Sequence, residues 1–251
     1  MLEPSQPDDL SEAAAANQTE WFARVTEAAG GSVHREAGIT WTSAPGGSTF
    51  AFPRLSQERL ELLLPRFLED AVDTREASCW SLLPTHPPSS ARALLAAGFR
   101  DGWQAHWMAV DVGEPVESLR LEGVRVAVVD VPWAPTDLPW DGPGMSAARA
   151  RLLDERPQRV WQVGAWRGSR PVGHATLNVT TDELGVAGIY DMGVAAHERR
   201  RGIGSALTST ALELGRAAGC RVATLNATPE GELLYRTLGF RPVGVAQTWW
   251  R

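Results

Sequence analysis

The sequence has little cysteine, and its two cysteines lie far apart. Cys79 and Cys220 are 141 positions from each other, so they match neither a disulfide framework nor the spacing of a zinc site. The five histidines are scattered and lack the short spacings of a metal-binding pair. We therefore expect no metal, and two buried cysteines that behave as small hydrophobic residues.

Long apolar runs and excess positive charge are also lacking. No apolar run approaches the roughly 20 residues of a membrane-spanning helix, and the N-terminal MLEPSQPDDL lacks the basic start and apolar core of a secretory signal. The net charge of -6 does not favour nonspecific binding to nucleic acid. These features predict a cytoplasmic monomer or homodimer with neither a membrane nor a nucleic-acid partner.

Helical and strand-like patterns alternate along the 251 residues. A polar stretch at 113–123 predicts a boundary between a first domain, 1–113, and a second domain, 123–251. This order of elements predicts an α/β or α+β fold with a mixed sheet. Strands are expected at 32–44, 48–53, 77–84, 103–112, 124–132, 159–168, 170–180, 186–194, 220–227 and 240–250, and helices at 11–30, 56–73, 89–99, 145–155, from about 202, and 230–239.

Two segments align without a gap at an offset of 141 positions. They are CWSLLPTHPPSSARALLAAGFR from Cys79 and CRVATLNATPEGELLYRTLGFR from Cys220. Both contain an expected strand, a loop, a helix and a Gly-Phe-Arg exit, which indicates an internal duplication. Tyr235 falls on Leu94 at this offset, and the glycines discussed next fall on Glu61 and Leu63. The first copy therefore keeps scaffold residues only, and we expect chemistry in the second copy alone.

The segment YDMGVAAHERRRGIGSALTSTALELG places arginines and two glycines directly before an expected helix. The start of a helix presents unpaired N–H groups and a partial positive charge. Glycines allow close approach to a ligand, and arginines donate hydrogen bonds in a fork that fits phosphate oxygens. Together these features predict a diphosphate site.

Three phosphate-binding motifs have to be separated here. The Walker loop needs Gly-x4-Gly-Lys-Ser/Thr, which does not occur in this sequence. The dinucleotide fingerprint needs a third glycine where Leu207 stands, and it must follow a strand closely. Seven residues separate Val194 from Gly202, which does not suit that turn. The pattern Arg-x-x-Gly-x-Gly remains, matched by Arg199, Gly202 and Gly204.

At these residues the chain resembles the GNAT superfamily of acyl-CoA N-acyltransferases. MGVAAHERRRGIGSAL resembles its acyl-CoA-binding motif, and NATPEGELLYRTLGF resembles the strand and helix that follow. The first half is similar to the degenerate half of tandem GNAT proteins. The resemblance implies a mixed sheet in which two parallel strands diverge around acyl-CoA, and it implies acetyl-CoA as co-substrate.

The resemblance also implies which residues hold the donor. The pantetheine arm would pair with the strand backbone at 192–194, and the diphosphate would lie on N–H groups from about Arg200 to Ala206. Ser205 would add a hydroxyl, and Asn226 would hold the arm or a bridging water. The implied donor-binding residues are Met192, Gly193, Val194, Arg199, Arg200, Arg201, Gly202, Ile203, Gly204, Ser205, Ala206 and Asn226.

Acyl transfer to an amine requires a neutral amine, a stabilised oxyanion and a protonated leaving thiolate. Tyr235 matches the tyrosine that many relatives use as general acid, and the backbone N–H of Val194 is the expected oxyanion donor. Asp191 is the expected base. Glu183 and His174 are alternatives, and some relatives use no dedicated base.

The acceptor site is less defined, because only one helix is expected between 133 and 155. Trp133 and Trp140 could line an apolar pocket, with the first half as its other wall. We predict an N-acetyltransferase that acts on a primary amine of a small molecule. The alternatives are an acyl-CoA-binding or sensing protein without transfer, and a Fem-like peptidyltransferase that uses aminoacyl-tRNA.

Overall fold

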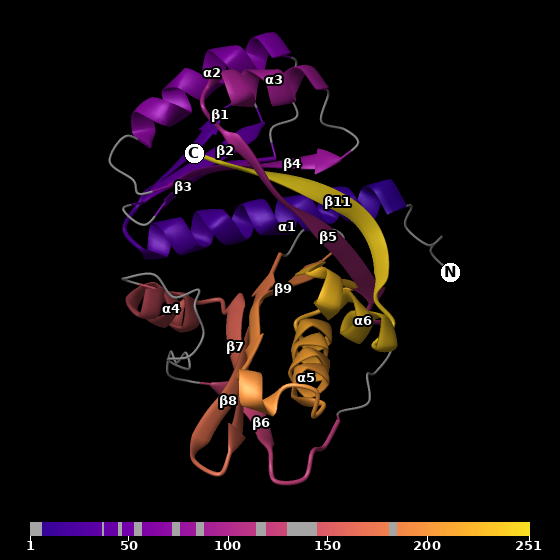
Figure 1. The fold of residues 1–251 in the computed structure, drawn as a ribbon. Helices are drawn as coiled ribbons and strands as arrows, with labels where there is room; N and C mark the ends of the chain where they lie inside the picture. Colours follow the sequence, from indigo (N-terminus) through magenta and orange to yellow (C-terminus); the bar gives the residue numbers. More distant parts are fainter. Residues whose placement is uncertain are drawn as a thin grey trace.

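The structure, a computed structural model, describes residues 7–36, 38–44, 47–52, 57–71, 76–83, 88–113, 119–129, 145–180 and 185–251 (Figure 1). Trp133, Trp140 and Glu183 lie outside these ranges. The first half contains α1 (Pro7–Ala28), β1 (Ser32–Glu36), β2 (Ile39–Ala44), β3 (Gly47–Ala51), α2 (Gln57–Asp70), β4 (Ala77–Leu83), α3 (Pro88–Ala96) and β5 (Arg100–Asp111). The second half contains β6 (Arg125–Val129), α4 (Met145–Asp154), β7 (Val160–Arg167), β8 (Arg170–Val179), β9 (Val186–Val194), a 3-10 turn at Ala196–Glu198, α5 (Ile203–Ala217), β10 (Val222–Ala227), α6 (Pro229–Thr237) and β11 (Arg241–Trp250).

The strands form a single sheet of 11 strands in the order β1-β2-β3-β4-β11-β5-β10-β9-β8-β7-β6. Two neighbouring pairs, β3–β4 and β9–β10, are parallel, and the other pairs are antiparallel. Helix α5 packs on β7, β8 and β9, while α1 crosses the middle of the molecule and contacts strands from both halves (Figure 1). The expected mixed α/β fold is confirmed.

The two halves exchange their last strands. Strand β5 ends the first half but lies between β10 and β11 of the second half, and β11 in turn lies between β4 and β5 of the first half. The sheet therefore runs through both halves without a break. The boundary at 113–123 remains a prediction.

The register between β5 and β11 supports the internal duplication. Ala105 lies opposite Ala246, its own counterpart at the offset of 141, so an approximate two-fold axis passes through this pair. Pairs on one side of the axis recur on the other side at the same offset. They are Arg241–Ala109 with Trp250–Arg100, Pro242–Met108 with Trp249–Asp101, and Val245–His106 with Gln247–Gln104.

The gapless alignment is wrong at the preceding strand. Cys79 of β4 lies opposite Trp249, whereas its structural counterpart on β10 is Leu225, which lies opposite Met108. The reason is loop length, because residues 84–87 separate β4 from α3 but Thr228 alone separates β10 from α6. The apparent match of Cys79 with Cys220 is therefore a coincidence.

A backbone feature supports the duplication independently. Phe50 pairs with Cys79 and Ile189 pairs with Leu225, so Phe50 and Ile189 are equivalent. Two residues later, Phe52 and Asp191 both have positive φ, at 43° and 49°. Non-glycine residues rarely adopt this conformation, so its recurrence at equivalent positions indicates a shared strand distortion.

One expected strand in the first half is wrong. The range 32–44 is a hairpin of two strands, β1 and β2, because Gly38 adopts a φ of +80°. The sequence signal was a single glycine without a turn partner, which is weaker than the Pro-Gly-Gly turn that follows.

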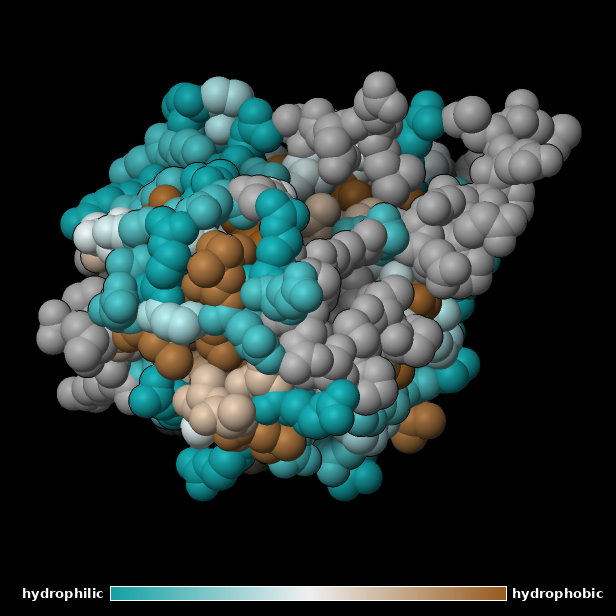
Figure 2. All heavy atoms as spheres, turned by 90° about the horizontal axis from the view of Figure 1, so that it is seen from above, coloured by the Kyte–Doolittle hydropathy of each residue, from teal (hydrophilic) through white to brown (hydrophobic). Residues whose placement is uncertain are grey.

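Buried hydrophobic residues form separate cores on the two sides of the sheet. One core lies under α5 and α6, another under α2 and α3, and α1 covers the sheet centre and meets α4. The surface above α2 and α3 shows small groups of hydrophobic residues between hydrophilic ones (Figure 2). None of the described helices is long and apolar enough to cross a membrane.

Candidate functional site

The candidate site lies where β9 and β10 separate. These parallel strands pair from Val186 opposite Val222 to Ile189 opposite Leu225, and the pairing stops there. Beyond this point β9 continues to Val194 beside β8 only. The divergence leaves one edge of β9 without a neighbouring strand among the described residues.

The backbone of Val194 faces this divergence. The N–H of Ala195 donates to the carbonyl oxygen of Val172 at 2.9 Å, so Ala195 points toward β8. Successive residues of a strand point their N–H and C=O groups to opposite sides, and Val194 therefore points away from β8. Its N–H therefore faces the divergence, and its carbonyl accepts a hydrogen bond from Nε of Arg199 at 3.1 Å.

The loop before α5 turns the start of the helix toward the same place. Arg200 and Gly202 both have positive φ, at 57° and 79°. Gly202 is the N-cap residue of α5 and provides no side-chain cap. Among the described residues, no backbone acceptor is found for the N–H groups of residues 203–205. They are free to donate to an anion, in line with the helix partial charge.

Two details of the expected diphosphate site need correction. The N–H of Ala206 donates to the carbonyl of Gly202 at 3.0 Å, so it belongs to the helix and is not available to a ligand. Gly204 also lies close to α6, because a Cβ there would lie 3.0 Å from Cδ2 of Leu234. Ser205 is half-buried beside it.

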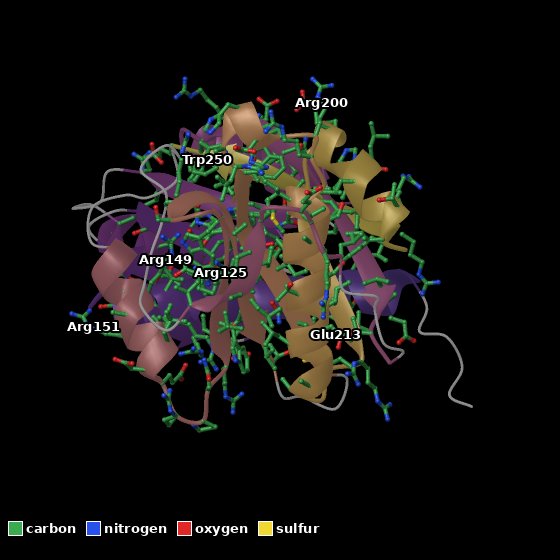
Figure 3. The ribbon with its side chains drawn as sticks, turned by 90° about the horizontal axis from the view of Figure 1, so that it is seen from below. Arg125, Arg149, Arg151, Arg200, Glu213 and Trp250 are labelled. Atoms are coloured by element: carbon green, nitrogen blue, oxygen red, sulfur yellow. The ribbon has the colours of Figure 1, made fainter. Side chains whose placement is uncertain are left out.

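The three arginines of the loop do different things. Arg199 binds the Val194 carbonyl, and Arg201 forms an ion pair with Glu198 at 3.1 Å. Arg200 extends outward from the fold (Figure 3) and is exposed. The sequence predicted one role for all three, whereas the geometry leaves Arg200 as the arginine best placed to meet a ligand.

Glu198 anchors the loop and was missed as a functional residue. Its side chain is 7% exposed, and both its oxygens accept hydrogen bonds from Arg167 of β7, at 3.0 and 3.1 Å. The hydrogen bond from Arg167 lowers the pKa of the Glu198 carboxyl, with further contributions from Arg201. The ionised carboxylate therefore holds the loop against β7. No sequence pattern distinguishes Glu198 from its charged neighbours.

Tyr235 lies in the core between α6 and the sheet. It is 7% exposed, and its ring contacts Phe240 at a centroid distance of 5.7 Å. Burial raises the pKa of its phenol to about 12. Tyr235 joins the hydrophobic cluster that Met192 and Val194 pack against, on the α5 side of the sheet.

Asn226 follows the last residue of β10 that pairs with β9, and it is half-buried. Its amide nitrogen donates to Oε1 of Gln18 at 2.6 Å, and its Oδ1 is buried without a hydrogen-bond partner among the described residues. The structure thus places this expected donor-binding residue on the edge opposite Tyr190 of β9.

Asp191 forms an ion pair with Arg149 of α4, at 3.3 Å. Arg149 is 4% exposed and lies between α4 and the sheet (Figure 3). The pair ties α4 to the distorted part of β9. The alternative base His174 is completely buried in β8 opposite Gly193, and Glu183 lies outside the described residues.

Comparison with known proteins gives a family match for the second half of the chain. Residues 125–240 match the model of the acetyltransferase (GNAT) family. The matched range includes the divergence, the loop before α5 and Tyr235. No curated protein matches the sequence.

Solved structures of GNAT proteins share the fold over nearly the whole chain. A GCN5-related N-acetyltransferase from Kribbella flavida has a TM-score of 0.65 at 18% identity and covers 94% of each chain. A tandem GNAT protein from the clavulanic acid biosynthesis pathway has a TM-score of 0.57 at 14% identity, covering 99% of this chain and 97% of that one. A GCN5-related N-acetyltransferase from Sphaerobacter thermophilus has a TM-score of 0.56 at 16% identity, covering 95% of this chain and 92% of that one.

A groove of about 860 Å³ runs along α1, between the β1–β2 hairpin and α4 of the GNAT domain. Arg24 joins its walls, because the guanidinium binds Glu20 of α1 and Glu155 beyond α4, each at 2.6 Å. Carboxylates outnumber guanidinium groups in the walls. The charged residues are Glu12, Glu20, Glu27 and Glu155, with Arg24, Arg35 and Arg151.

The two tyrosines of the chain provide a test of how deeply the residues around the divergence are buried. Burial raises the pKa of Tyr190 well above 10, with the charges of Asp191 and Glu20 nearby, and that of Tyr235 is about 12. At pH 10.5 we expect almost no tyrosinate absorbance in the folded protein, whereas about three quarters of the tyrosine in the unfolded chain is ionised. An ultraviolet titration of folded and guanidinium-unfolded protein measures both.

The sign of the linked effect on stability follows. Because folding favours the protonated phenols, their contribution to the free energy of unfolding is complete below pH 10 and is lost as the pH rises from 10 toward 12. About three quarters of one tyrosinate equivalent in the folded protein at pH 10.5 would show that one of the two tyrosines is not buried as described.

Proposed function

We propose that this protein is an N-acetyltransferase that moves an acetyl group from acetyl-CoA to a primary amine of a small molecule. The observation that carries the proposal is the start of α5, whose unpaired N–H groups lie beside the free edge of β9. A diphosphate there would accept charge-assisted hydrogen bonds of about 1.5–3 kcal/mol each from the N–H groups of residues 203–205. Arg200 adds a guanidinium at the same end of the loop.

The pantetheine arm would then extend along the free edge of β9 toward Val194. The Val194 N–H remains available to it or to the oxyanion, while the Val194 carbonyl would become available only if Arg199 moved away. The amide of Asn226 lies across the divergence. The Val194 N–H fits an extended amide-bearing chain, because it offers a hydrogen bond at the free edge of a strand.

The reaction is a direct attack. The amine nitrogen forms a bond to the thioester carbonyl carbon, and the Val194 N–H stabilises the oxyanion that results. When the carbon–sulfur bond breaks, Tyr235 donates its proton to the departing thiolate. Burial keeps this phenol protonated throughout the working pH range, so it holds a proton when the thiolate departs. Its pKa of about 12 lies above that of a thiol, so the transfer requires the hydroxyl and the sulfur to lie within hydrogen-bond distance.

The amine proton leaves by water or through Asp191. Asp191 also forms an ion pair with Arg149, so we assign it a further role in holding β9 and α4 in place. The acceptor enters from the groove along α1, whose excess of carboxylates favours a protonated amine before it loses its proton at the site.

The proposal is tested by release of free CoA thiol from acetyl-CoA with a panel of small primary amines. We expect turnover with at least one primary amine, and none with its tertiary counterpart, which cannot form a neutral amide. CoA binding without turnover across the panel would favour the acyl-CoA-sensing alternative. Failure to bind CoA would contradict both.

A further inference from the structure

Helix α1 belongs to the first half of the chain, but two of its side chains reach the site in the second half. Asn17 and Gln18 are neighbours in sequence, and they are 0% and 4% exposed. Buried amides carry several donors and acceptors that need partners. Their partners lie more than 150 positions away, on β8, β9 and β10.

Asn17 fixes the β9 side of the divergence. Its amide nitrogen donates to the carbonyls of Val186 at 3.0 Å and Asn178 at 3.3 Å, and its Oδ1 accepts from the Tyr190 hydroxyl at 2.6 Å. Trp21, one turn along α1, stacks on the Tyr190 ring at 5.1 Å with an interplanar angle of 9°. Tyr190 is the first residue of β9 beyond its pairing with β10.

The strand makes room for this amide. A Cβ at Gly188 would lie only 2.0 Å from Oδ1 of Asn17. No side chain fits at that separation, so the glycine on β9 and the asparagine on α1 are matched to each other. The contact is therefore a built feature of the boundary between the two halves.

Gln18 fixes the opposite edge. Its Oε1 accepts a hydrogen bond from the Asn226 amide nitrogen at 2.6 Å. This bond determines which way the Asn226 amide points, because its nitrogen must face Gln18. Its oxygen then faces away from Gln18, toward a small cavity between the two halves.

That cavity is about 10 Å³ and is lined by Gln18, Trp107, Tyr190, Asn226 and three neighbouring residues. Its size is close to the minimum for one water molecule. Two buried polar atoms on its lining residues, Nε1 of Trp107 and Oδ1 of Asn226, have no hydrogen-bond partner among the described residues. One is a donor and the other an acceptor, so one water can satisfy both.

We propose that α1 positions both edges of the acyl-CoA site, with Asn17 and Gln18 as positioning residues and one ordered water between Trp107 and Asn226. Asn17 holds β9 at Tyr190, and Gln18 holds β10 at Asn226. The first half of the chain thereby sets the width of the divergence that receives the pantetheine arm. The inference rests on the proposed function, since it concerns the same donor site.

The test separates the arm of CoA from its diphosphate. Isothermal titration calorimetry is performed with CoA and with 3′-phosphoadenosine 5′-diphosphate, which lacks the pantetheine arm. For Gln18→Met we expect CoA affinity to fall about three- to tenfold, the value of one hydrogen bond. Affinity for the armless nucleotide should stay within twofold, because the loop before α5 is untouched.

Two further variants distinguish positioning from a general loss of packing. If Gln18 acts through Asn226, the double variant Gln18→Met/Asn226→Leu binds CoA no more weakly than Asn226→Leu alone. Gln247→Met is the matched control, because Gln247, like Gln18, is a buried glutamine with hydrogen-bonded amide groups. The Gln247 amide nitrogen donates to the carbonyls of Gly102 and Thr248. We expect it to bind CoA as the wild type does.

The outcomes are distinct. Unchanged CoA affinity in Gln18→Met, additive losses in the double variant, or equal losses for both ligands would overturn the positioning role and leave the proposed function intact. If the wild-type protein binds neither ligand, the proposed function fails and this inference fails with it.

Discussion

Replacing Gly202 with valine is expected to weaken CoA binding by about 10²-fold or more. Gly202 has a φ of +79°, a conformation that a β-branched residue rarely adopts. A Cβ there would also lie 3.1 Å from Cδ2 of Leu121. The backbone must rotate to relieve this strain, and the N–H groups of residues 203–205 then lose their common direction. Loss of one or two charge-assisted hydrogen bonds accounts for the expected change.

Gly219 provides a matched control at the other end of the same helix. Its φ is +88°, and a Cβ there would contact nothing within 4 Å. Gly219→Val therefore introduces similar backbone strain away from the proposed diphosphate site. We expect both variants to lower the melting temperature, but only Gly202→Val to lose CoA affinity by calorimetry. Equal affinity in the two variants would contradict the assignment of the loop.

The Tyr235→Phe variant is expected to lower kcat for acetyl transfer by about 10²-fold while the Kd for CoA stays the same. Phenylalanine keeps the ring that contacts Phe240 and fills the same space in the core. The change removes only the hydroxyl, so it removes the proton donor to the departing thiolate. General acid catalysis contributes about 10²–10⁴ to a rate.

Stopped assays of thiol release give kcat, and calorimetry gives the Kd. A melting temperature within a few degrees of the wild type shows that packing is preserved. If kcat is unchanged, Tyr235 has only a packing role, as Leu94 has at the equivalent position of the first half, where it is completely buried. An equal loss in kcat and in CoA affinity would assign the hydroxyl to donor binding instead.

The geometry of the loop before α5 was largely predictable because its signals are local. Glycine at 202 is required by a positive φ, and the residues after it begin a helix whose first N–H groups are unpaired. Such features depend on residues that are neighbours in sequence, so a short sequence motif is enough to predict them. The family match over residues 125–240 agrees with that motif.

The parts that sequence reasoning missed depend on distant partners. Glu198 is recognisable only through Arg167, and the structural contact of Asp191 only through Arg149. Local reasoning gave the three arginines one role, but Arg201 is committed to Glu198. The available N–H set also ends at Ser205, because the carbonyl that Ala206 uses comes from Gly202 at the start of the same helix.

The boundary between the halves was the least predictable feature. Asn17 and Gln18 stand in the run AAAANQTE, where an asparagine in a helix interior is unfavourable without a partner. The unfavourable placing of an asparagine inside a helix was the signal available in the sequence, but it does not indicate which strand supplies the hydrogen-bond partner. The exchange of β5 and β11 likewise has no local signature. The side chains of a strand alternate between the two faces of a sheet whichever strand lies next to it.

A crystal structure of the protein with acetyl-CoA tests the central claim most directly. We predict that the diphosphate lies within hydrogen-bond distance of the N–H groups of residues 203–205, with the thioester between Val194 and Tyr235. A complex in which the diphosphate binds elsewhere, or in which the Tyr235 hydroxyl points away from the sulfur, would contradict the account.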